Sequence, residues 1–190
     1  MPQDFTNGKI QDHPDLLLYC DGACEPTNPG GVCTAGWVIF DRKTNERLVE
    51  DAVFVREGDK LSTNNMGEYC ALGFALRFLH DQGWAGTLHV RTDSQLVVNQ
   101  VLEKWKCNSP HLQKLRARIW ELMEQLGLEP ISPENEIDFQ PQHPRENPCV
   151  IAWVRRELNA DADALSKKAF HERQAKTGKK WPFPRRNDPH

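Results

Sequence analysis

Short apolar runs in the first third of the chain predict three strands. Residues 16–20, Leu-Leu-Leu-Tyr-Cys, form a continuous apolar run that suits a strand buried on both faces. Two further apolar runs, over 34–40 and 47–55, are separated by the turn-like segment 41–45. Together the three runs predict consecutive antiparallel strands.

A helical pattern of apolar residues comes next. The polar residues at 62–65 can cap the start of this helix, its apolar positions recur every three or four residues, and Gly83 suits its end. The residues over 87–92 then alternate between apolar and polar types. Because side chains alternate across a strand, this segment predicts a fourth strand.

Two more helices follow this strand. Asp93 or Ser94 can cap the first of them, which runs to about Trp105. Pro110 opens the next helix and Gly127 ends it. Its apolar positions form one stripe that we expect to pack in the core: Leu112, Leu115, Ile119, Leu122 and Leu126.

The last third of the chain is less regular. Five prolines between 129 and 148 predict a loop or insertion over 127–149, because proline interrupts regular elements. The apolar run over 150–154 predicts a fifth strand, and Asn159 can cap a last helix that runs to about Ala169. No periodicity remains after that helix.

This element order, βββαβααβα, predicts an α/β fold with a mixed five-stranded sheet flanked by helices. With 190 residues, of which 38% are hydrophobic, the chain can form one compact domain with a core, which we expect over 15–170. A short N-terminal extension over 1–14 and a basic, disordered tail over 171–190 complete the predicted organisation.

Composition excludes several classes of protein. No stretch approaches 18 consecutive apolar residues, and the first residues lack the features of a signal peptide, so we expect a soluble, cytoplasmic protein without membrane contact. The net charge of −3 excludes a protein that coats nucleic acid with its whole surface. No oligomerisation signal is visible, and we expect a monomer.

The six cysteines of the chain do not have the spacing of a zinc site, which needs paired ligands such as Cys-x-x-Cys. In the reducing compartment that we expect, they are free thiols rather than disulfides.

Four acidic residues at the boundaries of predicted elements carry the candidate chemistry: Asp21, Glu68, Asp93 and Asp163. Each of them alone is more typical of a helix cap or a helix-dipole partner. Brought together, several carboxylates repel one another unless divalent cations neutralise them. Ligand sets made only of oxygen suit Mg²⁺ or Mn²⁺, and two such ions about 4 Å apart can activate water to attack a phosphodiester.

The segments around these residues form four ordered motifs. They read DGACEPTNPGG over 21–31, STNNMGEYCAL over 62–72, RTDSQLVVNQ over 91–100 and WVRRELNADADALS over 153–166. In these motifs and their order, the chain resembles type 1 ribonuclease H over roughly residues 15–170. The resemblance makes this segment the catalytic domain and implies the ribonuclease H-like fold.

The resemblance also implies an activity and a role for each carboxylate. It implies an endoribonuclease that hydrolyses the RNA strand of RNA/DNA hybrids with two Mg²⁺ or Mn²⁺ ions and leaves 5′-phosphate and 3′-hydroxyl ends. Asp21, Glu68 and Asp93 then hold the ions and Asp163 completes the shell of the second ion, while Glu68 also meets the RNA 2′-hydroxyl.

Further residues match groups that hold the hybrid in related enzymes. The resemblance implies that Thr63 contacts a DNA phosphate, and the positions implied along the minor groove are Cys24, Asn28, Asn65 and Gln95. Asn64 is a further expected substrate-binding residue. The alternative for each is ordinary capping or turn formation.

The chain departs from many family members between 154 and 159, where no His is found. It resembles the branch of the family that lacks this catalytic-loop His, so that water could shuttle protons or Arg156 could aid product release. A basic cluster, Lys104, Lys106, Lys114, Arg116 and Arg118, and the basic tail could bind phosphates or lie on solvated surfaces.

Two alternatives remain. One is another nuclease of the same fold, such as a junction resolvase or an exonuclease, which also uses clustered carboxylates. The other is a binding module for hybrid or double-stranded RNA without activity, which would have lost at least one carboxylate.

Overall fold

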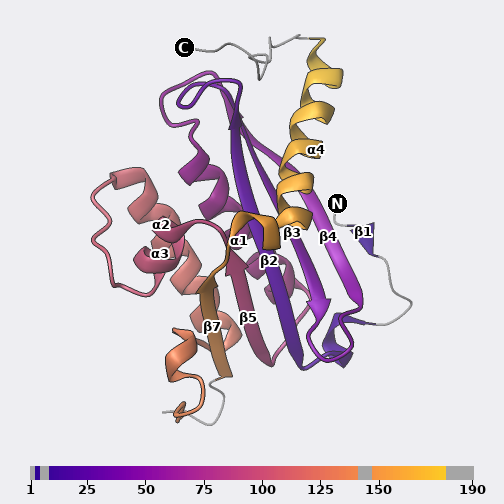
Figure 1. The fold of residues 1–190 in the computed structure, drawn as a ribbon, viewed down its shortest axis with the longest axis vertical. Helices are drawn as coiled ribbons and strands as arrows, with labels where there is room; N and C mark the ends of the chain where they lie inside the picture. The colour runs from indigo at the N-terminus through magenta and orange to yellow at the C-terminus, as the bar shows by residue number, and fades with distance from the viewer. Residues whose placement is uncertain (1–2, 5–8, 141–146, 179–190) are drawn as a thin grey trace.

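A computed structural model describes residues 3–4, 9–140 and 147–178 of the chain. The expected α/β fold is confirmed: a mixed sheet is covered by helices on both faces (Figure 1). The five expected strands are β2 (Asp15–Glu25), β3 (Val32–Asp41), β4 (Arg47–Glu57), β5 (Thr87–Thr92) and β7 (Asn147–Trp153). They occupy the sheet in the order β4-β3-β2-β5-β7.

Two short strands extend this sheet at its edges. The strand β1 (Gln3–Asp4) pairs with β4, and β6 (Leu128–Ile131) pairs in parallel with β7, so the sheet has seven strands. The expectation of only a loop over 127–149 is therefore wrong at its start. An edge strand tolerates proline because one of its sides makes no ladder hydrogen bonds, which explains how Pro130 fits within β6.

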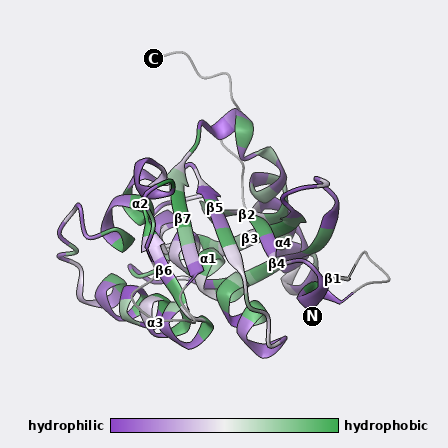
Figure 2. Ribbon diagram, turned by 90° about the horizontal axis from the view of Figure 1, so that it is seen from below, coloured by the Kyte–Doolittle hydropathy of each residue, from purple (hydrophilic) through white to green (hydrophobic). Residues whose placement is uncertain are grey.

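Four α-helices cover the sheet: α1 (Asn64–Asp81), α2 (Gln95–Val101), α3 (Pro110–Leu126) and α4 (Ala160–Thr177). The main core lies between one face of the sheet and the helices α1 and α3. Figure 2 shows these helices beside the sheet, with the ribbon coloured by hydropathy. The helix α4 crosses the opposite face, where Leu165 packs against Val38 and Phe40 of β3.

The strand β2 shows how the sequence pattern produces this arrangement. Leu16 and Leu18 are buried in the main core, whereas Leu17 and Tyr19 pack against the α4 side of the sheet. The continuous apolar run therefore serves two cores, as expected for a strand buried on both faces. All six cysteines of the chain are free thiols.

The expected ends of one strand and one helix were wrong. The strand β2 continues past Cys20 because residues 21–25 pair with β3. The helix α2 ends at Val101, before the expected Trp105, and Glu103 has a left-handed φ of 59° that stops helical propagation.

The last helix is longer than expected, and its end overturns part of the predicted disordered tail. The helix α4 continues to Thr177 because Phe170 is buried and Arg173 both ion-pairs with Glu57 and stacks over Phe54 of β4. Residues 171–177 are therefore helical, and the rest of the predicted tail lies outside the described residues. None of the described helices is long and apolar enough to span a membrane.

Candidate active site

Parallel pairing of β2 and β5 brings the first two carboxylates to the same level of the sheet. In the register of these strands Tyr19 pairs with Arg91, and the same offset places Asp21 opposite Asp93. Asp93 directly follows β5, whereas Asp21 lies within β2, because this strand continues along β3. The expectation that Asp21 ends its strand was therefore wrong, although its place beside Asp93 is unaffected.

The third carboxylate, Glu68, reaches the site because α1 lies directly on β2. A Cβ atom added to Gly22 would lie 2.0 Å from the backbone nitrogen of Glu68 and 2.1 Å from the carbonyl carbon of Gly67. Only a glycine permits so close an approach of strand and helix. The residue next to Asp21 thus determines how near the first turn of α1 can come.

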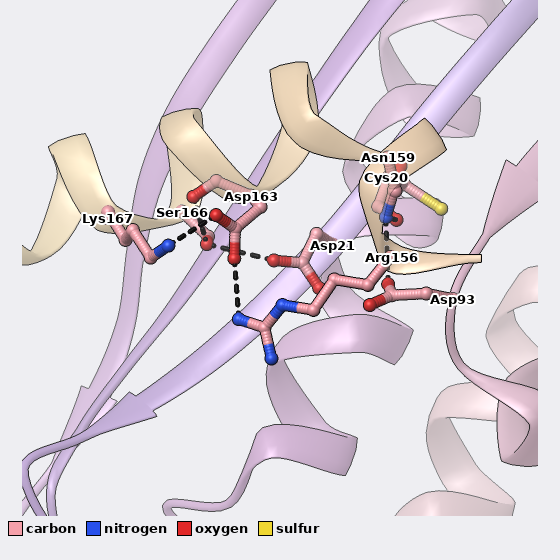
Figure 3. Close-up of polar contacts among 8 residues, drawn as sticks. All are labelled: Cys20, Asp21, Asp93, Arg156, Asn159, Asp163, Ser166 and Lys167. Atoms are coloured by element: carbon pink, nitrogen blue, oxygen red, sulfur yellow. Dashed lines mark hydrogen bonds and ion pairs between the residues drawn. The ribbon is translucent and has the colours of Figure 1, made fainter. Parts of the chain in front are cut away.

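The fourth carboxylate, Asp163, is carried by α4, which also packs closely on the sheet. A Cβ atom at Gly36 of β3 would lie 2.4 Å from the backbone nitrogen of Ser166. This contact places the Ser166 hydroxyl 3.1 Å from Asp21 Oδ2 and 2.9 Å from the carbonyl oxygen of Asp163. Ser166 therefore joins α4 to the carboxylate on β2 (Figure 3).

Asn159 orients Asp93. Its side-chain amide donates hydrogen bonds to Asp93 Oδ1 at 2.8 Å and to the carbonyl oxygen of Cys20 at 3.0 Å (Figure 3). It makes no side-chain capping bond to α4, so the expected capping role was wrong. The indole N–H of Trp153 in addition donates to the Asp93 carbonyl oxygen at 3.1 Å.

Ser94 serves Glu68 in a similar way. The Ser94 hydroxyl donates a hydrogen bond to Glu68 Oε2 at 2.5 Å. The oxygen of this hydroxyl also accepts a hydrogen bond from the backbone N–H of Val97. Of the two residues that could cap α2, Ser94 is thus the one that does so.

Asp163 has cationic partners, unlike the other three carboxylates. Its Oδ1 accepts a hydrogen bond from Arg156 at 2.7 Å, and its Oδ2 contacts the ammonium group of Lys167. Asp161, two residues earlier, instead ion-pairs with Arg47 of β4 and is 53% exposed. Of these two aspartates, Asp163 is the one that shares the Ser166 hydroxyl with Asp21.

The pKa values show how strongly the carboxylates interact. Burial, together with the charges of Asp93, Asp163 and Glu68, raises the pKa of Asp21 to about 7. Burial and the charge of Asp93 also raise the pKa of Glu68, against the effect of Ser94. Although partial burial acts in the opposite direction, Lys167 and Arg156 hold the pKa of Asp163 below its usual value.

These observations fit a site for divalent cations. Among the described residues none forms an ion pair with Asp21, Glu68 or Asp93, so no directly bonded cationic side chain neutralises these three carboxylates. The side-chain oxygen of Asn159 is also buried without a partner. Oxygen donors of this kind suit Mg²⁺ or Mn²⁺.

The carboxylates are not arranged around one point in this structure. No three His, Cys, Asp or Glu side chains of the described chain form a ready-made ligand group. Each carboxylate instead has its own partner in the protein, from Ser166 on Asp21 to Arg156 on Asp163. Cation binding therefore requires reorientation of side chains, in particular of Asp163.

The expected substrate-binding residues lie around the start of α1. The Thr63 hydroxyl accepts a hydrogen bond from the backbone N–H of Met66 and caps this helix. The exposed Asn28 accepts from the backbone N–H of Asn64 at 3.3 Å, and Asn65 follows on the first turn, partly exposed. Gln95 is exposed at the start of α2.

Cys24 differs from these residues, because it is only 5% exposed. Its thiol lies 3.1 Å from the carbonyl oxygens of both Thr27 and Ser62 and thereby connects the loop after β2 to the start of α1. The backbone of Cys24 is buried as well, because the exposed 5% is that of the whole residue, and its contact with a substrate stays a prediction.

Two of the five residues in the basic cluster expected after α2 form ion pairs with acidic residues. Lys104 pairs with Glu134 at 3.0 Å, and Arg118 pairs with Glu121 at 2.5 Å. Arg116 stacks on Trp120 at 4.4 Å from the ring centroid. The count of basic residues did not reveal these partners.

The sequence motifs contained most of the supporting residues, but the sequence analysis did not assign their roles. Ser94 and Asn159 were interpreted only as helix caps, and Ser166 and Lys167 received no role. Ser166 and Lys167 stand three and four positions after Asp163, which is the spacing of neighbours on one helix face. That spacing was the available signal.

The chain is similar to known proteins over most of its length. Residues 19–128 match the protein family described as reverse transcriptase-like. A protein of Polynucleobacter asymbioticus named ribonuclease H is 30% identical over 173 residues, which cover 84% of this chain and 92% of that protein. Ribonuclease HI of Halobacterium salinarum is 36% identical over 174 residues, which cover 90% of this chain and 72% of that protein.

Solved structures show the same similarity. RNase H1 of Halobacterium salinarum has a TM-score of 0.65 and 28% identity, with 83% of this chain and 98% of that chain covered. LC11-RNase H1, isolated from compost, was solved in complex with an RNA/DNA hybrid. That complex has a TM-score of 0.66 and 28% identity, also with 83% of this chain and 98% of that chain covered.

Proposed function

The chain belongs to the type 1 ribonuclease H family and is a ribonuclease H, a hydrolase. From this premise we propose that it cleaves internal bonds in the RNA strand of RNA/DNA hybrids with two divalent cations, Mg²⁺ or Mn²⁺. The hybrid bound to LC11-RNase H1 supports this choice of substrate. We expect products with 5′-phosphate and 3′-hydroxyl ends, as the family resemblance implies.

The observation that carries the proposal is that four carboxylates from separate parts of the chain lie near enough for their charges to act on one another. Burial raises the pKa of Asp21 to about 7, together with the charges of Asp93, Asp163 and Glu68. A protein that only bound nucleic acid would gain nothing from this accumulation of negative charge, because phosphates are themselves anions. The cluster instead supports cation-dependent hydrolysis.

When bound, two divalent cations supply charge neutralisation, an activated water and stabilisation of the leaving oxygen. The chain supplies the groups that hold and orient them. Asp21 and Asp93 are held by Ser166 and Asn159, so their carboxylates face the site in defined directions. Glu68, the fifth residue of α1, is the carboxylate that we expect to meet a ribose 2′-hydroxyl, as the family resemblance implies.

Strand selection requires contacts outside the carboxylate cluster. We propose that Thr63, Asn64 and Asn65 contact the hybrid at the start of α1, where the helix dipole also favours a phosphate. Asn28 and Gln95 extend this surface along the minor groove, whose 2′-hydroxyls can be bound by polar side chains without base specificity. Cys24 supports this surface by connecting the loop after β2 to the start of α1.

The segment between β7 and α4 contains no His, and Arg156 is the basic residue of this segment that contacts a catalytic carboxylate. We propose that water transfers the proton in place of a loop imidazole. Arg156 is suited to aid product release, because its exposed guanidinium can reach a phosphate that leaves the site.

The test is cleavage of end-labelled duplexes by the purified full-length chain. We expect internal cleavage of the RNA strand of the hybrid with Mg²⁺ or Mn²⁺, no cleavage after addition of EDTA, and no cleavage of duplex DNA or duplex RNA. The variant Asp93→Asn should lose activity by orders of magnitude, and Asp161→Asn is its matched control. Cleavage of duplex DNA would favour another nuclease of this fold, and hybrid binding without cleavage would favour a binding module.

A further inference from the structure

Asp163, the carboxylate expected to complete the shell of the second cation, is contacted by two cationic side chains of the protein itself. Both carboxylate oxygens of Asp163 are occupied: Oδ1 by Arg156 at 2.7 Å and Oδ2 by Lys167. The hydrogen-bond partners of the other three carboxylates are neutral side chains, namely Ser166, Ser94 and Asn159. Asp163 is thus the one member of the cluster whose charge the described protein neutralises.

Arg156 also interacts with carboxylates beyond its direct partner. The hydrogen bond and charge of Asp163 raise the pKa of Arg156, and the charges of Asp21 and Asp93 add to this effect. Figure 3 shows the Arg156 side chain extended beside all three of these carboxylates. The guanidinium therefore lies where a divalent cation would experience the same attraction.

Arg156 and Lys167 can separate from Asp163 with little loss of free energy. The Arg156 side chain is 70% exposed and that of Lys167 is 54% exposed, whereas that of Asp163 is only 18% exposed. Exposed ion pairs contribute little to stability, because water solvates the separated charges well. A divalent cation with several oxygen ligands can therefore displace both groups.

We propose that Arg156 and Lys167 are built-in counter-cations that hold Asp163 in the metal-free protein and must leave it when a divalent cation binds. This inference rests on the proposed function and adds a positioning role for both residues. They compete with the cation and so set the cation concentration that the site requires. If they instead held Asp163 ready as a ligand, their removal would weaken cation binding, so the two roles predict opposite signs.

The test measures Mn²⁺ binding to the metal-free, full-length protein without nucleic acid, by electron paramagnetic resonance of free Mn²⁺. We expect Arg156→Gln and Lys167→Gln each to bind Mn²⁺ about three- to tenfold more tightly, the size expected for removal of one nearby, partly screened charge. Arg155→Gln and Lys168→Gln are matched controls, because each removes one charge from the neighbouring residue. Arg156→Lys, which keeps the charge, should stay close to the wild type.

The outcomes separate this inference from the proposed function. Unchanged or weaker binding by Arg156→Gln and Lys167→Gln, while the wild type binds Mn²⁺ and cleaves hybrid, would overturn the inference alone. If Arg155→Gln and Lys168→Gln bound Mn²⁺ as tightly as Arg156→Gln and Lys167→Gln, the inference would be overturned as well, because the change in affinity would then come from net charge. A wild type that binds no Mn²⁺ would overturn both. Thermal unfolding in EDTA confirms that each variant is folded.

Discussion

The side-chain amide of Asn159 donates a 2.8 Å hydrogen bond to Asp93, a residue 66 positions earlier in the chain. The same amide reaches the carbonyl oxygen of Cys20, next to Asp21. Asn159 therefore connects the two strands that carry Asp21 and Asp93 to the start of α4. It acts as an orienting residue behind the carboxylates.

Loss of this amide should reduce activity more than stability. We expect Asn159→Ala to lower hybrid cleavage about 10- to 100-fold, the range typical of residues that orient metal ligands. Asn159→Asp should be at least as harmful, because a carboxylate there would repel Asp93. Cleavage rates at saturating Mg²⁺ give the measurement, and activity within twofold of the wild type would contradict the orienting role.

The two aspartates at the start of α4 should differ sharply. Asp163→Asn removes a carboxylate of the cluster and should lower cleavage by orders of magnitude, whereas Asp161→Asn removes only an exposed ion pair with Arg47 and should have a mild effect. Parallel rate measurements on both variants decide the matter. The reverse ranking would show that the wrong aspartate has been placed in the site.

Gly22 offers a test of the packing that brings Glu68 to Asp21. Gly22→Ala places a Cβ atom 2.0 Å from backbone, so strand and helix must separate, and we expect a loss of roughly 3 kcal/mol or more in the free energy of unfolding. The control is Gly73→Ala within α1, where the nearest atom would be 3.9 Å away. That change should stabilise the protein by about 0.5–1 kcal/mol. Denaturant unfolding measures both.

The raised pKa of Asp21 predicts how stability depends on pH in EDTA. Because the folded protein binds this proton more tightly than the unfolded chain, the contribution of Asp21 is most favourable below about pH 4 and is lost as pH rises towards 7. Asp21→Asn should abolish this loss. The difference in unfolding free energy between the variant and the wild type should grow from pH 4 to 7 by about 2–4 kcal/mol. A constant difference would contradict the raised pKa.

The tail should be tested by two deletions, because α4 extends further than the sequence suggested. Removal of 179–190 should weaken hybrid binding and flatten its salt dependence, since the segment is basic, without lowering stability. Removal of 172–190 should also destabilise the fold, because it takes away the contacts of Arg173 with Glu57 and Phe54. An unchanged salt slope in the shorter deletion would show that the tail does not contact nucleic acid.

The sequence by itself determined the order of the main elements and the identity of the four carboxylates. Local signals were sufficient there: α3 begins at Pro110 and ends before Gly127 as expected, and the alternating pattern over Thr87–Thr92 predicted β5. The order of the motifs identified Asp163 as the fourth carboxylate. These features depend on residues close together in the chain, and local propensity reports on them directly.

Only the tertiary structure decided where β2 and α4 end and which side chain each carboxylate contacts. The length of β2 depends on pairing with β3, and the length of α4 depends on contacts with β4. The roles of Asn159 and Ser166 require strands and helices distant in sequence to meet, through backbone approaches that only Gly22 and Gly36 permit. Such contacts form between segments, so no pattern within one segment encodes them.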